Sequence, residues 1–293
     1  MPMGPFQLAA SLETDGEVSA ADIGEIRDHP GFRAAVEAYA AANLARYSGL
    51  SLVERWLISD MGRASLSGSV AVLDSQGLLT AASFMNSPPI RSGEVSRGRA
   101  RLYLHRAMAN GLIAAVAGDA TPGRNTPLAP TPRFRAVMTG VLSVGLLAVS
   151  RIAPEVAPAL SRLEDVGFLR RASFHVGRLL AAQNLFPLDL PVRLFQGRDG
   201  GTRMLEVLIQ QQAPDRVRLL GRCRASRSAL ARAGFVSRAH VIQTLRDGLA
   251  AGLLETDGRW LIIAPALSDD ATRYYATLFA VTRRATLAAL SDT

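Results

Sequence analysis

Arginine side chains are the groups in this sequence best suited to bind a ligand, and they are clustered. All 33 basic residues are Arg, and the net charge is +8. Seven of them lie between Arg216 and Arg238 with no acidic residue, and five lie between Arg91 and Arg106 with only Glu94. A guanidinium is permanently charged, and its planar fork of donors matches phosphate oxygens and the O6/N7 edge of guanine. The clusters therefore favour a polyanionic partner.

Each cluster overlaps one copy of a stretch that occurs twice. Residues 93–113 and 234–254 align without a gap, and eight of their first twenty positions are identical. This similarity predicts an internal duplication. The identical pairs are Gly93/Gly234, Val95/Val236, Ser96/Ser237, Arg97/Arg238, Leu104/Leu245, Ala109/Ala250, Gly111/Gly252 and Leu112/Leu253.

Each copy has the pattern of one helix, predicted at about 95–110 and 236–251. A Gly provides a turn, the Ser three positions later can cap the helix, and a second Gly ends it. Apolar residues at every fourth position predict one buried stripe. The stripes are Ala100, Leu104, Met108 and Leu112 in the first copy, and Val241, Leu245, Leu249 and Leu253 in the second. The pairs Leu102/Gln243 and Tyr103/Thr244 are expected on the outward side.

The shared string, together with SALARAGFVSRAHV before and through the second copy, resembles the recognition helix of bacterial winged helix-turn-helix regulators. In that motif the helix N-terminus reads base edges in the major groove of DNA. The resemblance and the Arg clusters together give the predicted DNA-binding residues. They are Arg91, Ser96, Arg97, Arg99, Arg101, Arg124, Arg224, Arg227, Ser237, Arg238, His240, Gln243 and Arg259.

The segments after each copy fit a wing hairpin followed by a helix. In the second copy, Asp257-Gly258 is a hairpin turn signal between residues 253–254 and 260–263. In the first, a Gly- and Pro-rich segment places Arg124 at the tip. The spacing of the copies resembles the MarR type of regulator, which dimerises through terminal helices. The resemblance implies a mainly α fold with small β wings, in which two winged-helix domains form a covalent pseudo-dimer joined by long helices near 136–150 and 271–290.

Composition suggests how the chain is divided. Residues 1–30 are acidic and are expected to form a disordered tail. The two domains are predicted at 31–165 and 166–293. The acidic start lacks the pattern of a secretory leader, and the apolar run at 136–150 is short for a membrane span, so a cytoplasmic, nucleoid-associated protein is expected. Cys223, the single cysteine, fits that reducing compartment.

These features predict a DNA-binding transcriptional regulator that acts on an imperfect inverted repeat as a monomer. The sequence has no Walker-type loop, no nucleophile elbow and no metal-ligand spacing among its four His and one Cys, so neither an enzyme nor a cofactor is expected. Two alternatives stay open: a replication initiator with two winged helices, and a protein-interaction scaffold without DNA binding. A small-molecule effector and oxidation of Cys223 are possible regulators. Repression and activation are not distinguished.

Overall fold

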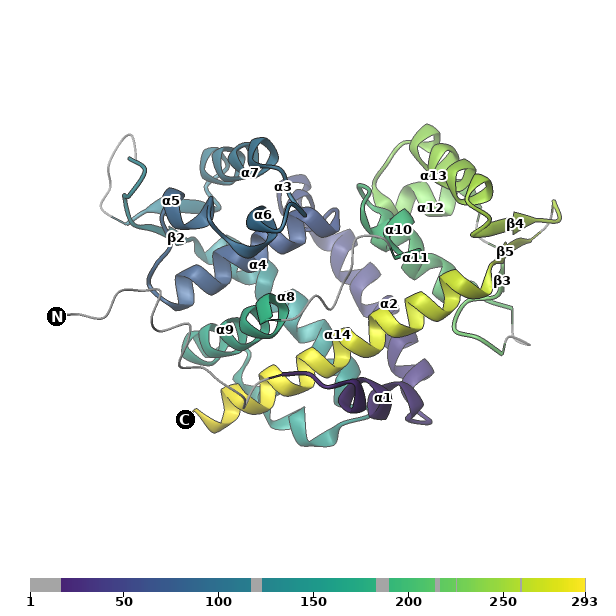
Figure 1. Cartoon of the computed structure of the whole chain (residues 1–293), viewed down its shortest axis with the longest axis horizontal. Coiled ribbons are helices and arrows are strands. Elements are labelled where there is room, and N and C mark those ends of the chain that lie inside the picture. Colours follow the sequence, from purple (N-terminus) through teal and green to yellow (C-terminus); the bar gives the residue numbers. More distant parts are fainter. Residues whose placement is uncertain are drawn as a thin grey trace.

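The computed structural model describes residues 17–116, 123–182, 190–213, 217–224, 226–258 and 260–292. In these residues the protein is mainly helical, with two small antiparallel sheets (Figure 1). The elements up to the middle of the chain are α1 Ala20–Asp28, α2 Phe32–Gly49, α3 Leu52–Leu57, α4 Met61–Ser75, α5 Ala81–Phe84, α6 Pro88–Arg91, α7 Arg97–Ala109, β1 Ile113–Ala115, β2 Leu128–Pro130 and α8 Pro132–Val149. The remaining elements are η1 Pro154–Arg162 (a 3-10 helix), α9 Val166–Ala182, α10 Arg193–Gln196, α11 Gly201–Gln210, β3 Arg222–Cys223, α12 Arg227–Gly234, α13 Arg238–Ala250, β4 Leu254–Thr256, β5 Leu261–Ile263 and α14 Pro265–Ser291.

Two lobes with the same order of elements lie along one edge of the molecule. In the first lobe (residues 52–130), helix α4 is followed by α5, α6, α7 and the hairpin β1–β2. In the second lobe (residues 193–263), helix α11 is followed by β3, α12, α13 and the hairpin β4–β5. Figure 1 shows α7 and α13 at the same upper edge, with a hairpin at each end of the molecule. The repeat in the sequence is therefore a repeat in structure.

The two hairpins are held in equivalent ways. Leu112 and Leu253, which follow the paired Gly residues, accept backbone hydrogen bonds of 2.9 and 3.0 Å from Thr131 and Ala264. In the second lobe β3 pairs with β5 as a third strand. In the first lobe no such strand is found among the described residues, and the segment before α6 contacts the hairpin through bonds from Leu128 N to the Leu79 carbonyl (2.8 Å) and from Ala82 N to the Arg124 carbonyl (3.0 Å). The predicted turn at Asp257-Gly258 is confirmed, and Gly258 has a φ of +84°.

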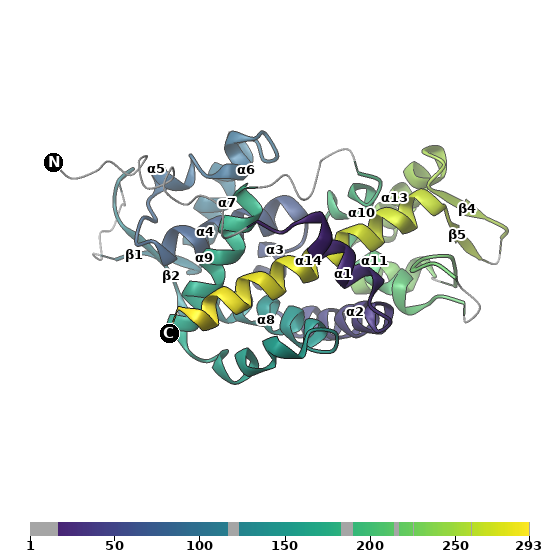
Figure 2. The same cartoon turned by 60° about the horizontal axis from the view of Figure 1, so that its bottom comes forward.

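Four longer helices, α2, α8, α9 and α14, carry the lobes. Each lobe rests on a helix from the other half of the chain, since α4 packs against α9 and α11 packs against α2. Helices α8 and α14, predicted to meet at a seam, are in contact, and α14 runs from the second lobe to the C-terminal end beside α9 (Figure 2). One hydrophobic core joins these helices to the second lobe, while the first lobe has a core of its own. The division at residue 165 stays a prediction.

The expectation of a disordered tail is wrong for residues 20–28, which form α1. Ser19 and Asp22 make a capping box, and the side chain of Ile26 is 2% exposed where α1 packs against α14. An acidic composition did not prevent helix formation, because the cap satisfies the first backbone N–H groups and the apolar side chains are buried. Residues 1–16 lie outside the described residues.

The segment before α7 forms two short helices. Helix α5 has four residues, and a separate helix, α6, begins at Pro88. Proline is compatible with the first helical position, where its missing N–H would have no partner. Pro88 and Pro89 therefore end one helix and permit the next.

Helix α8 is the one helix in the described part of the chain that is long and apolar enough to cross a membrane, with a mean hydropathy of 1.3 and 39% of it buried. Its buried side chains include Phe134, Val137, Leu146 and Val149, and it packs against α2 and α14. A core helix passes the same test of length and composition. The packing favours that interpretation.

Candidate nucleic-acid interface

The N-terminal ends of α7 and α13 are built in the same way. Ser96 Oγ accepts a hydrogen bond from Arg99 N (3.3 Å), and Ser237 Oγ accepts one from His240 N (3.1 Å), as predicted. Each cap leaves other backbone N–H groups of the first turn free, and the helix dipole places partial positive charge there. Arg97 and Arg238 occupy the first helical position, so each adds a full positive charge to an end that already attracts anions.

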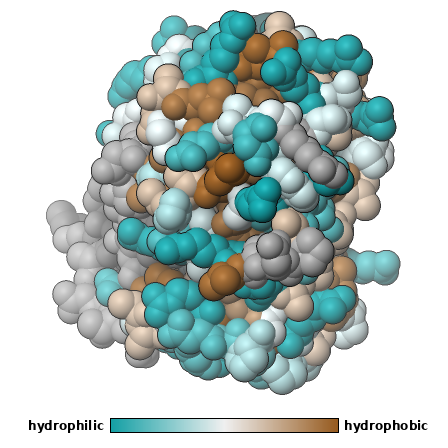
Figure 3. All heavy atoms as spheres, turned by 90° about the vertical axis from the view of Figure 1, so that its right-hand side faces the viewer, coloured by the Kyte–Doolittle hydropathy of each residue, from teal (hydrophilic) through white to brown (hydrophobic). Residues whose placement is uncertain are grey.

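Most of the predicted binding residues are exposed. Arg97, Arg101 and Arg238 form no ion pair with a carboxylate within the described residues. Arg224 lies over the Trp260 ring, 4.4 Å from its centroid, beside the hairpin of the second lobe. Hydrophilic side chains cover much of this end of the molecule, with smaller hydrophobic areas between them (Figure 3). The exposed predicted residues are Arg91, Ser96, Arg97, Arg99, Arg101, Arg124, Arg224, Arg227, Ser237, Arg238 and Gln243. Arg259 lies outside the described residues.

Two of the predicted DNA-binding residues are held by contacts within the protein or are partly buried. The Arg99 guanidinium binds Asp60, with Nη2 2.5 Å from Oδ1, although part of the side chain remains exposed. The side chain of His240, its equivalent in α13, is half-buried, and Nε2 is buried without a hydrogen bond. The pair Arg99/His240 is therefore the least accessible part of the predicted site. The sequence pattern around Arg99 could not predict its contact with Asp60, because Asp60 lies 39 positions earlier in the chain.

The expectation that Tyr103 and Thr244 face outward is wrong. Their exposed fractions are 1% and 0%. The Tyr103 hydroxyl is 2.7 Å from the hydroxyl of Ser67, which also bonds to the Leu57 carbonyl, and burial raises the pKa of Tyr103. Leu102 and Gln243 do face outward, so sequence differences between the two helices can still reach a ligand.

The predicted apolar stripe is confirmed in the first copy, where Ala100, Leu104 and Leu112 are buried and Met108 packs against the core of the first lobe. In the second copy it is wrong at Leu249, which is 40% exposed. A step of four residues advances about 40° beyond a full turn, so two steps from Val241 carry Leu249 away from the centre of the buried face. Leu112 and Leu253 lie beyond the helices, which Gly111 and Gly252 follow with φ of +66° in each case. These two Gly residues end the helices as predicted.

The turns that enter α7 and α13 differ. Gly93 has a φ of +80°, whereas in the second lobe the left-handed residue is Phe235 (φ 51°), one place later. The Phe235 ring receives the Arg55 guanidinium at 3.5 Å from its centroid and lies 5.8 Å from the Tyr47 ring. The second turn is thus supported by residues of the first half of the chain, which a comparison of the two copies alone could not reveal.

Cys223, named above as a possible site of regulatory oxidation, lies in strand β3 and is 0% exposed. Its Sγ lies 3.6 Å from the Leu261 carbonyl. A buried thiol is shielded from oxidants and is not stabilised as a thiolate. Its position favours a packing role over redox sensing.

Comparisons of this chain with protein-family models, with curated proteins and with solved structures give no match.

Proposed function

We propose that this protein is a sequence-specific DNA-binding regulator in which the two lobes act as winged helix-turn-helix units of the MarR-like type. The observation that supports this most is the pair of helices α7 and α13. They lie along one edge of the molecule, and each begins with a Ser cap and an exposed Arg. One chain would then provide both halves of what is elsewhere a dimer.

The DNA contact proposed for each arginine follows from its position in the lobe. Arg97 and Arg238, at the first helical position, would contact guanine O6/N7 or phosphate in successive major grooves. Arg124 and Arg224, near the hairpins, would contact neighbouring phosphates. Because Arg97 and Arg238 lack a carboxylate partner in the described residues, their charge is available to DNA without breaking an internal ion pair.

Selection of bound duplexes from a random library, followed by fluorescence anisotropy, tests the proposal. We expect an imperfect inverted repeat with half-site centres about 10 base pairs apart. Arg97→Ala and Arg238→Ala should each weaken binding by about 1–3 kcal/mol and relax opposite half-sites. Arg151→Ala, an exposed arginine after α8, is the matched control and should change binding little. Absence of duplex binding at low salt would support the scaffold alternative.

Mapping of bound DNA across the genome separates the remaining alternatives. Enrichment at promoters fits a regulator, whereas enrichment confined to a replication origin fits an initiator. A small-molecule effector also stays a proposal. A compound that raises the melting temperature of the protein and changes its affinity for DNA would support an effector.

A further inference from the structure

The N-terminal ends of α4 and α11, the equivalent first helices of the two lobes, meet between the lobes. Gly200 N donates a hydrogen bond of 2.8 Å to the Ser59 carbonyl. Gly200 has a φ of +67°, and a Cβ there would lie 2.3 Å from the Gly234 carbonyl oxygen. The start of α11 can lie this close to Gly234, at the end of α12 in the same lobe, only because position 200 carries no side chain.

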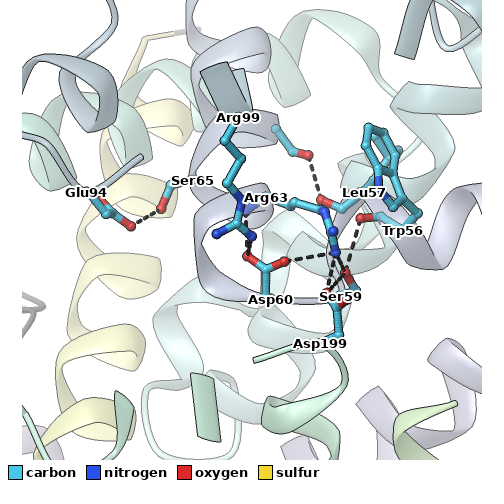
Figure 4. Close-up of polar contacts among 10 residues, drawn as sticks. Trp56, Leu57, Ser59, Asp60, Arg63, Ser65, Glu94, Arg99 and Asp199 are labelled. Atoms are coloured by element: carbon cyan, nitrogen blue, oxygen red, sulfur yellow. Dashed lines mark hydrogen bonds and ion pairs between the residues drawn. The ribbon is translucent and has the colours of Figure 1, made fainter. Parts of the chain in front are cut away.

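A chain of ion pairs crosses the same junction (Figure 4). Asp60, whose side chain is 2% exposed, binds Arg99 of α7 and lies 2.9 Å from Arg63 Nη1. Arg63 also binds Asp199, which belongs to the second lobe and accepts a hydrogen bond of 3.2 Å from the Ser59 hydroxyl. Two carboxylates and two guanidiniums are thus balanced across the contact.

The series of ion pairs continues from the junction to helix α13. Arg198, next to Asp199, binds Asp247 of α13 (Nη2–Oδ2, 2.5 Å) and donates to Thr244 Oγ1 (3.3 Å). Side-chain contacts and one peptide unit therefore lead from α7 to α13. Within the described residues, this is the route by which charged side chains connect the two helices.

We infer that the Asp60–Arg63–Asp199 bridge, called the latch below, fixes the separation of α7 and α13. Arg63 and Asp199 are then positioning residues, which determine which half-site spacing is bound. The consequence for DNA rests on the proposed function. The mechanical part does not, because it concerns the distance between two helices of the free protein. Arg99 serves this latch through Asp60, which explains why it is the one outward arginine of α7 found with a carboxylate among the described residues.

The free protein tests the latch directly. Spin labels are placed at His105→Cys and Arg246→Cys, which are equivalent exposed positions of α7 and α13, in a Cys223→Ala background. Charge reversal at Asp199→Arg should broaden the distance distribution and shift its maximum, because Arg63 would then face a like charge. Asp269→Arg breaks an exposed ion pair with Arg218 away from the junction and should leave the distribution unchanged. Equal widths in the parent, Asp199→Arg and Asp269→Arg would overturn the latch.

Binding to a panel of duplexes with half-sites separated by 8 to 12 base pairs, around the roughly 10 expected, tests the consequence. The unsubstituted protein should prefer one spacing by about tenfold or more in affinity. Asp199→Arg should reduce that preference at least threefold. The melting temperature of Asp199→Arg should fall no further than that of Asp269→Arg. An unchanged spacing preference would overturn the positioning role. If the parent bound no duplex, the proposed function would fail, while the spin-label distances would still decide on the latch.

Discussion

Glu206 contributes to the free energy of unfolding, and this contribution should fall as pH rises towards neutrality. Its side chain is 0% exposed in α11, where it contacts α2. Oε1 accepts a hydrogen bond of 2.8 Å from Asn43, and Oε2 lies 3.3 Å from Arg203 Nε. Burial raises the pKa of Glu206 from 4.5 to about 7, although Arg203, Asn43 and Arg46 each lower it. Desolvation of the carboxylate outweighs these partners.

The sign and size of the effect follow from the difference between folded and unfolded states. Between about pH 4.5 and 7 the folded protein holds a proton on Glu206 that the unfolded chain has released, so stability falls as pH rises through this window. At about 1.4 kcal/mol per pH unit, the whole difference corresponds to about 3 kcal/mol. The contribution is fully present below about pH 4.5 and is lost above about pH 7.

Urea unfolding of Glu206→Gln between pH 4.5 and 8 measures this contribution. The stability of the variant relative to the wild type should increase by about 3 kcal/mol across the window, because glutamine does not ionise. All other titrating groups are shared and cancel in the difference. Glu54→Gln is the control. Hydrogen bonds from Arg133 and Ser51 lower the pKa of Glu54 to about 2, so its substitution should give an offset that does not change over this range. A constant difference between Glu206→Gln and the wild type would refute the reasoning.

Three other predictions concern the backbone and the charge of the lobes. Gly200→Ala should cost at least about 2 kcal/mol more in urea unfolding than Gly252→Ala, because both have positive φ but only the first would place a Cβ against the Gly234 carbonyl; equal costs would contradict the close approach. Ser237→Ala should lower the free energy of unfolding by about 1 kcal/mol in the same urea experiment, because the helix cap is lost. An unchanged free energy would show that the cap does not stabilise α13. Arg97→Ala should reduce the slope of log K against log salt by about 0.9 in DNA titrations, and an unchanged slope would exclude a phosphate contact.

Local sequence chemistry was enough for the repeated helix and its limits. Ser96 and Ser237 cap, Gly111 and Gly252 end the helices, and Asp257-Gly258 forms a hairpin turn, because each depends on backbone geometry and hydrogen bonds within a few residues. The mainly helical fold with small strands follows from the same signals. The repeat also predicted correctly that two equivalent helices would exist.

The tertiary structure decided which side of each element faces the solvent and which half of the chain supports which lobe. Tyr103 is buried because Ser67, 36 positions earlier, provides its hydroxyl with a partner, and Arg99 is engaged by Asp60 at a similar distance along the chain. Glu206 depends likewise on Asn43, 163 positions away. Duplication in the sequence by itself determined two copies of a capped, arginine-bearing helix. Their exposure, their separation and the junction between them depend on long-range contacts, which leave no periodic pattern in a single sequence.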